Sequence, residues 1–147
     1  MIYTELTKRA MRLAYEAHAG QLDKCGDPYV FHPFHLAEQM PDETSVCVAL
    51  LHDVVEDTAV TLDDLARAFP PQVVEGVRLL THEEGTDYLD YVRAIKGHPI
   101  AERVKLADLA HNADESRYAG CLPSDAVLEK RRRKYAAARA VLLEGQG

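Results

Sequence analysis

The sequence has few cysteines, no long apolar run and no excess of basic residues. Its three cysteines, Cys25, Cys47 and Cys121, are widely spaced and include no C-x-x-C pair, so we expect neither a disulfide framework nor a thiolate zinc site. No apolar run approaches the roughly 20 residues that span a bilayer, and residues 1–5 lack the start of a signal peptide. These absences predict reduced thiols, a cytoplasmic protein and no membrane partner.

The charge balance is acidic, with a formal net charge of −7. A sequence-independent nucleic-acid binder needs a basic surface that displaces counterions from phosphates, so we expect no nucleic-acid partner. The one basic cluster, Lys130 to Lys134, lies inside a helical pattern and is interpreted as a solvated helix face. With 147 residues, of which 47% are apolar, the chain is predicted to form a single domain over residues 1–147.

Apolar residues recur every three or four positions along most of the chain, which is the period of amphipathic helices. The first helix is expected from Thr4 to His18. The other expected helices begin at His32-Pro33, run from Asp42 to about Thr58, 61–69, 71–80, 87–95 and 100–114, and begin at Ser124. No segment has the period-2 alternation of a strand. The sequence therefore predicts an all-α bundle of about eight helices.

Four ionisable residues interrupt the apolar run that starts at Val46: His52, Asp53, Glu56 and Asp57. On a continuous helix these residues share one polar stripe, because positions three and four apart lie on the same face. The stretch contains no Lys or Arg, and burying an unpaired carboxylate costs on the order of several kcal/mol. Either the stripe faces open solvent in a helical domain without a metal, or it lines a site for a divalent ion.

A second polar pair, Asp108 and Asn112, shares one helix face amid apolar neighbours. With His32 and the His52-Asp53 pair, Asp108 completes an ordered series of His, His-Asp and Asp. Two imidazoles and two carboxylates from three segments form a ligand set for one divalent metal ion. A mixed nitrogen and oxygen set with open water positions favours Mn²⁺.

This series resembles the signature of the HD phosphohydrolase superfamily. Three stretches are similar to the alarmone hydrolase domain of RelA/SpoT-type proteins, including small stand-alone versions: 17–33, with Gly26-Asp27-Pro28-Tyr29; 50–58, with His-Asp-x-x-Glu-Asp-Thr; and 104–112. The resemblance implies an all-α fold and an enzyme. That enzyme is a metal-dependent hydrolase of a phosphate or pyrophosphate ester of a nucleotide, with (p)ppGpp as a candidate substrate.

The resemblance also implies which side chains act. The metal ligands that it implies are His32, His52, Asp53 and Asp108. The carboxylates that it assigns to positioning and deprotonating the attacking water are Glu56 and Asp57, and the substrate-binding residues are Lys24 and Asn112.

Two positions depart from the family pattern. Asp23 stands where the alarmone hydrolases carry an Arg that stacks on the base, and Leu109 replaces a basic residue. We therefore expect weaker base recognition. A second hypothesis is a metal-binding nucleotide sensor or regulatory module with little turnover, although the presence of Glu56 and Asp57 favours an enzyme. The sequence leaves the oligomeric state open.

Overall fold

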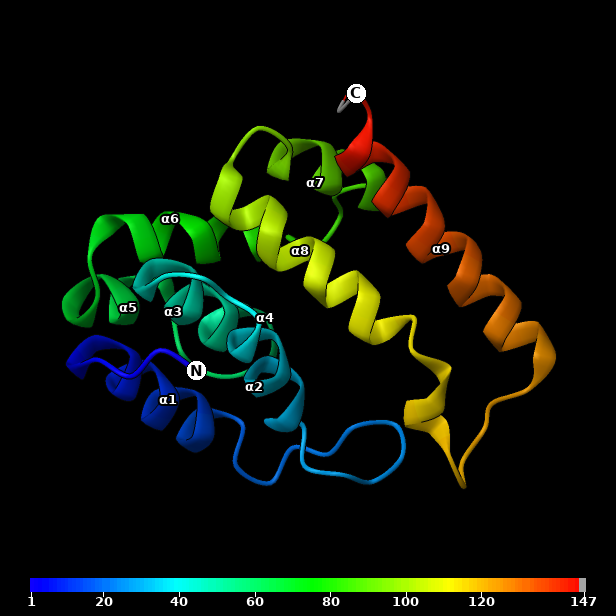
Figure 1. Cartoon of the computed structure of the whole chain (residues 1–147), viewed down its shortest axis with the longest axis horizontal. Helices are drawn as coiled ribbons and strands as arrows, with labels where there is room; N and C mark the ends of the chain where they lie inside the picture. The colour runs from blue at the N-terminus through cyan, green and yellow to red at the C-terminus, as the bar shows by residue number, and fades with distance from the viewer. Residues whose placement is uncertain (146–147) are drawn as a thin grey trace.

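The computed structural model describes residues 1–145, which form helices joined by loops (Figure 1). In chain order the elements are α1 Glu5–Ala17, α2 Phe31–Glu38, α3 Glu43–Leu51, α4 Val54–Asp57, α5 Leu62–Ala68, α6 Pro71–Leu80, α7 Tyr88–Ile95, α8 Pro99–Asn112, the short 3₁₀ helix η1 Glu115–Tyr118 and α9 Asp125–Leu143. The described residues contain no strand, only an isolated bridge between Leu22 and Pro28. The all-α prediction is confirmed.

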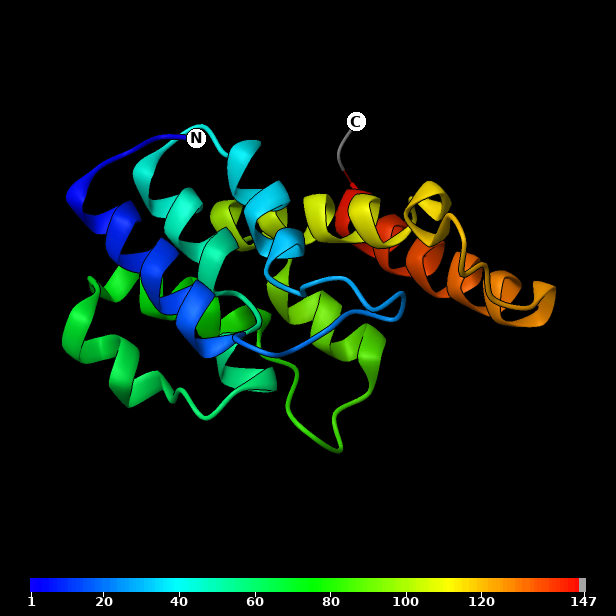
Figure 2. The same cartoon turned by 90° about the horizontal axis from the view of Figure 1, so that it is seen from below.

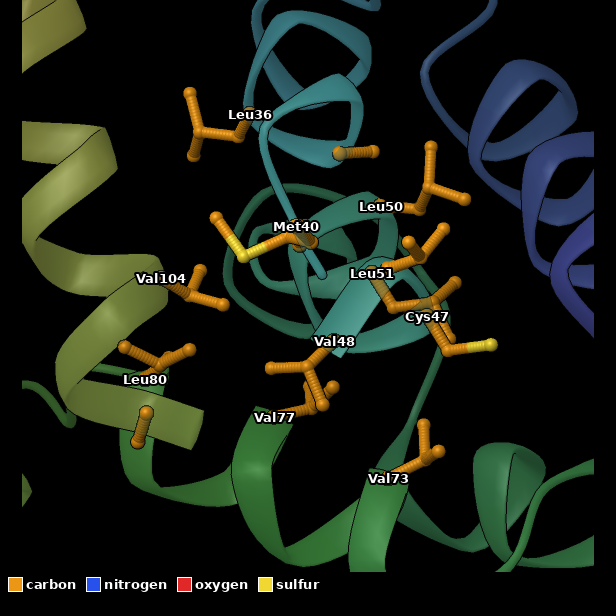
Figure 3. Close-up of a cluster of buried hydrophobic side chains, with 14 of the residues drawn as sticks. Leu36, Met40, Cys47, Val48, Leu50, Leu51, Val73, Val77, Leu80 and Val104 are labelled. Carbon is orange, nitrogen blue, oxygen red and sulfur yellow. The ribbon is translucent and has the colours of Figure 1, made fainter. Parts of the chain in front are cut away.

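Helix α3 lies at the centre of the fold. Its residues from Ser45 to Leu51 are fully buried, and α1, α2, α6 and α8 pack around it. Figure 3 shows the apolar side chains of α3 between Leu36 of α2, Val77 of α6 and Val104 of α8. A helix that is apolar on all sides is typical of a buried helix. Because α3 ends at Leu51, the residues that follow it begin deep inside the molecule.

Helix α6 approaches α3 closely at a glycine. A Cβ atom at Gly76 would lie 2.8 Å from Cγ2 of Val48 in α3. Real Cβ contacts are longer than this, so an alanine at this position would force the two helices apart. The close contact fixes α6, and with it the start of the loop that carries His82.

Polar caps start most of the helices. Thr61 and Asp64 form the capping box expected from the sequence, and the side chains of Asp42, Asp87 and Ser124 each accept a hydrogen bond from a backbone N–H in the first turn of their helix. No helix among residues 1–145 is long and apolar enough to cross a membrane.

Helix α8 lies between the α2–α3 pair and the long helix α9, which occupies the side of the molecule away from α1 in both views (Figures 1 and 2). A disulfide joins Cys25, in the loop between α1 and α2, to Cys121, in the segment between α8 and α9, with Cα atoms 5.8 Å apart. The expectation of no disulfide was wrong. The two cysteines are 96 residues apart in the chain, and only the tertiary fold brings them within bonding range.

Candidate metal centre

The four predicted metal ligands come together from three segments. His32 belongs to α2, His52 and Asp53 follow α3, and Asp108 belongs to α8. Nε2 of His32 lies 2.9 Å from Oδ1 of Asp108, and Nε2 of His52 lies 3.0 Å from Oδ2 of Asp53 and 3.7 Å from Oδ1 of Asp108. Ligand atoms of His32, His52 and Asp53 all lie within 4.8 Å of one another. The expected cluster therefore forms at the buried end of α3.

The continuous helix expected from Asp42 to Thr58 is interrupted at the cluster. Helix α3 ends at Leu51 and α4 begins at Val54. At this break Nδ1 of His52 donates to the carbonyl oxygen of Ala49, at 2.6 Å, which fixes the imidazole with Nε2 facing the cluster. The sequence did not reveal this break, because the helical spacing of apolar residues continues past it to Val54 and Val55.

The environment of His52 fits a bound cation. Its Nε2 atom is buried and has no hydrogen-bond partner of acceptable geometry within residues 1–145, even though Asp53 is close. Burial lowers the pKa of His52, but the carboxylates of Asp53 and Asp108 outweigh that effect and raise this pKa well above its usual value. A buried imidazole nitrogen that faces two carboxylates is suited to hold a metal ion, which then replaces the proton.

The charges around the cavity support the same conclusion. The cavity has a volume of about 310 Å³ and is lined by the carboxylates Asp53, Glu56, Asp57 and Asp108 and by the ammonium groups of Lys105 and Lys134. With neutral histidines the four carboxylates exceed the two ammonium groups by two charges. One divalent cation would neutralise this excess of two negative charges.

Lys105 is a site residue that sequence reasoning missed. Its Nζ atom donates to Oδ2 of Asp108 at 2.9 Å and lies 5.3 Å from the ring centroid of Tyr91. Burial lowers the pKa of Lys105, but Asp108 outweighs it and raises this pKa, so the ammonium stays charged. The acidic stretch itself contains no Lys or Arg, but α8 supplies this cation from outside it. The signal was the spacing of three residues between Lys105 and Asp108 on one helix.

Other side chains hold the predicted ligands from outside. The amide of Asn112 donates to Oδ1 of Asp108 at 3.0 Å, and the hydroxyl of Tyr29 donates to Asp53. Burial and the charge of Asp53 raise the pKa of Tyr29, which keeps the hydroxyl protonated. Asn112, expected to contact substrate, therefore also touches a predicted ligand. Tyr29 was not among the predicted site residues.

Glu56 and Asp57 line the same cavity as His52, Asp53 and Asp108, whereas His32 lines the adjoining one. Oε1 of Glu56 accepts a hydrogen bond from the backbone N–H of His82 at 2.6 Å. Burial, and to a lesser degree the charge of Asp53, raises the pKa values of both carboxyl groups. Two carboxylates with raised pKa values beside a predicted metal centre are suited to accepting a proton from water.

A second cavity, of about 390 Å³, adjoins the first. Tyr29, Asn112 and Tyr135 line both cavities, and Lys24 and Arg117 line only the second. Burial and the nearby charges of α9 lower the pKa of Lys24. The two cavities together provide a polar compartment at the predicted metal and a mixed polar and aromatic compartment beside it.

Asp23 also lines the second cavity, but its carboxylate is engaged in its own loop. Oδ1 of Asp23 accepts hydrogen bonds from the backbone N–H groups of Cys25, at 2.9 Å, and Asp27, at 3.0 Å. This is the local turn geometry that Asp favours. The departure from the family pattern at this position thus has a role in shaping the loop that carries Lys24.

The helical fold and the His, His-Asp, Asp cluster together define a member of the HD domain family. The family model described as "HD domain" matches residues 10–119, and the chain belongs to this family.

Among curated proteins the chain is similar to long alarmone enzymes. It is 36% identical over 140 residues to "Probable GTP pyrophosphokinase" of Mycobacterium leprae, covering 86% of this chain and 17% of that protein. It is 34% identical over 120 residues to "Bifunctional (p)ppGpp synthase/hydrolase SpoT" of Escherichia coli K12, covering 71% of this chain and 17% of that protein. The chain thus spans only about a sixth of the length of these relatives.

A solved structure matches nearly the whole chain. It is described in the words "A metazoan ortholog of SpoT hydrolyzes ppGpp and plays a role in starvation responses". It superimposes with a TM-score of 0.76 at 26% identity and covers 99% of this chain and 89% of that one. A protein of similar extent therefore has the same fold.

Proposed function

We propose that this protein is a metal-dependent hydrolase that cleaves a phosphate or pyrophosphate ester of a nucleotide, and that (p)ppGpp is a substrate. The observation that carries the proposal is the buried Nε2 atom of His52, which lies 3.0 Å from Asp53 and 3.7 Å from Asp108 in a cavity lined by four carboxylates and two ammonium groups. The similarity to a ppGpp-hydrolysing protein of nearly the same extent supports the choice of substrate.

His32, His52, Asp53 and Asp108 would hold one divalent ion, Mn²⁺ by the mixed nature of the ligand set. Such an ion supplies Lewis acidity toward a phosphoryl oxygen and lowers the pKa of water. Glu56 and Asp57 line the same cavity, so either carboxylate is placed to accept the proton of the attacking water. Lys105 and Lys134 offset the charge of the phosphates in that cavity.

The second cavity suits the nucleoside portion of the substrate. Lys24, Asn112, Tyr118 and Tyr135 offer hydrogen-bonding and aromatic groups there. A nucleotide that spans both cavities would place its phosphates toward Lys105 and its base toward Tyr118. The acidic net charge of −7 supports a small nucleotide rather than a nucleic acid as the partner.

The test begins with protein freed of metal by a chelator and then dialysed. Mn²⁺, Mg²⁺ or Zn²⁺ is restored, and release of pyrophosphate from ppGpp is compared with release from a panel of guanosine and adenosine nucleotides. We expect Mn²⁺-dependent hydrolysis of ppGpp with low selectivity over other nucleotide pyrophosphates. Tight nucleotide binding without hydrolysis of any member of the panel would contradict the proposal and identify a sensor instead.

A further inference from the structure

The imidazole of His111 lies against the outer nitrogen of His32. The two Nδ1 atoms are 2.7 Å apart, the ring centroids are 5.0 Å apart and the ring planes differ by 5°. With nearly parallel rings, this combination of a short nitrogen contact and a long centroid separation places the rings edge to edge in a common plane. That is the geometry of a hydrogen bond between imidazoles rather than of stacked faces.

The hydrogen bond determines where the protons lie. One of the two Nδ1 atoms must donate and the other must accept. Nε2 of His32 lies 2.9 Å from Oδ1 of Asp108, and without an ion this contact needs a proton on Nε2, because a carboxylate only accepts. When a cation binds, Nε2 gives up that proton and presents a lone pair to the ion. The proton of a neutral His32 then lies on Nδ1, so Nδ1 of His111 accepts it and His111 carries its own proton on Nε2.

We propose that His111 is a positioning residue for the metal centre: it accepts the Nδ1–H of His32 and so holds the Nε2 lone pair toward the cation. This inference rests on the proposed metal-dependent function. Metal-bound histidines in general donate their other N–H to an acceptor of this kind, and that acceptor orients the ring. Here the acceptor is a second imidazole instead of the more usual carboxylate or carbonyl.

The surroundings of His111 hold it in place. Its ring stacks on His35, with centroids 4.1 Å apart, and its carbonyl oxygen accepts a hydrogen bond from Nη1 of Arg117 at 2.9 Å. Asp108 and His111 are three residues apart on α8, so they contact the two nitrogens of His32 from one helix. The contacts between α2 and α8 therefore fix both the position and the rotation of the His32 ring.

The first test measures metal affinity rather than activity. Metal-free parent, His111→Ala and His111→Asn proteins are titrated with Mn²⁺ or Zn²⁺ in competition with a chromophoric chelator. We expect His111→Ala to weaken binding by about 10- to 100-fold, the usual effect of removing an outer hydrogen-bond partner. His111→Asn should recover much of the affinity, because its amide oxygen replaces Nδ1 as an acceptor. Equal affinity in the parent and the alanine variant would overturn the proposal.

His35→Ala is the matched control. It removes the ring stacked on the face of His111 but no hydrogen bond to His32. We expect its metal affinity to stay within about twofold of the parent, while a loss equal to that of His111→Ala would show that packing, not the hydrogen bond, is responsible.

A second measurement needs no variant and so does not depend on whether one folds. In the zinc-loaded parent, ¹⁵N–¹H correlation spectra of the imidazoles should show His32 protonated at Nδ1 and His111 protonated at Nε2. The opposite tautomers would refute the assignment. If the parent binds no metal at all, the proposed function fails. If the parent binds metal but His111→Ala leaves the metal affinity unchanged, only the proposed role of His111 fails.

Discussion

Replacing Lys105 with methionine should destabilise the metal-free protein by about 3–5 kcal/mol, the cost of leaving one member of a buried ion pair without its partner. The Lys105 side chain is buried, and its ammonium lies 2.9 Å from Oδ2 of Asp108. Methionine is nearly as long and keeps most of the packing against Tyr91. The loss should fall toward the lower limit, because His32 and Asn112 still contact the other oxygen of Asp108.

The assay is urea unfolding followed by circular dichroism, first with a chelator and then with saturating Mn²⁺. The slope with denaturant should match that of the parent, so that the shift in midpoint reports stability. With Mn²⁺ present the difference should shrink, because a cation again faces Asp108. Lys96→Met is the matched control, since Nζ of Lys96 lies 3.8 Å from an exposed Glu144 carboxylate and its removal should change stability by less than about 1 kcal/mol.

The double variant Lys105→Met with Asp108→Asn tests the pair directly. Because both charges are removed together, its loss should be smaller than the sum of the two single losses by at least about 1 kcal/mol. Additive losses, or a Lys105→Met loss as small as that of the Lys96 control, would refute the assignment of Lys105 as the internal partner of Asp108.

Three further sets of variants test the site and the first loop, and a thiol measurement tests the disulfide. Asp53→Ala should abolish metal binding measured by elemental analysis after dialysis, and full occupancy would remove Asp53 from the ligand set. Glu56→Gln should keep the metal but lower turnover of ppGpp by about 100-fold or more; unchanged turnover would remove Glu56 from the mechanism. Asp23→Arg should lower the Michaelis constant more than it changes turnover, with Asp23→Asn as the control that removes charge but keeps an acceptor for the loop. In air-oxidised protein, Cys25 and Cys121 should resist alkylation until reductant is added. Reduction should also lower the melting temperature, because it removes a constraint on the unfolded chain worth about 4–5 kcal/mol. Free labelling of both thiols would contradict the disulfide.

Apart from the metal cluster, the features that the sequence predicted are local. Apolar periodicity and polar caps located most helices, and the capping box of Thr61 and Asp64 formed as expected. The cluster of His32, His52, Asp53 and Asp108 also formed, because each lies in or beside a buried helix whose apolar face determines its direction. Their role as metal ligands stays a prediction.

The features that the sequence did not predict depend on pairs far apart in the chain or on small breaks in regular structure. The 96-residue separation of Cys25 and Cys121 gave no sign of their contact. The hydrogen bond of His32 to His111 joins residues 79 positions apart. The helix is interrupted after Leu51, where His52 hydrogen-bonds to a carbonyl oxygen, and apolar periodicity does not encode such a break. The pairing of Lys105 with Asp108 is local, because the two residues lie three positions apart on α8, but its closeness to the acidic stretch depends on the packing of α8.

The carboxylate at Asp23 illustrates how the structure changes the interpretation of a sequence departure. From the sequence alone, it replaces a base-stacking guanidinium and predicts weaker base recognition. In the structure one of its oxygens accepts two backbone N–H groups of the loop, which offsets part of its negative charge. The carboxylate therefore stabilises the turn that presents Lys24, and the second cavity contains a guanidinium from Arg117 instead of one from the first loop. Because removing Asp23 alters loop shape and charge together, only the comparison of Asp23→Asn with Asp23→Arg separates the two effects on substrate binding.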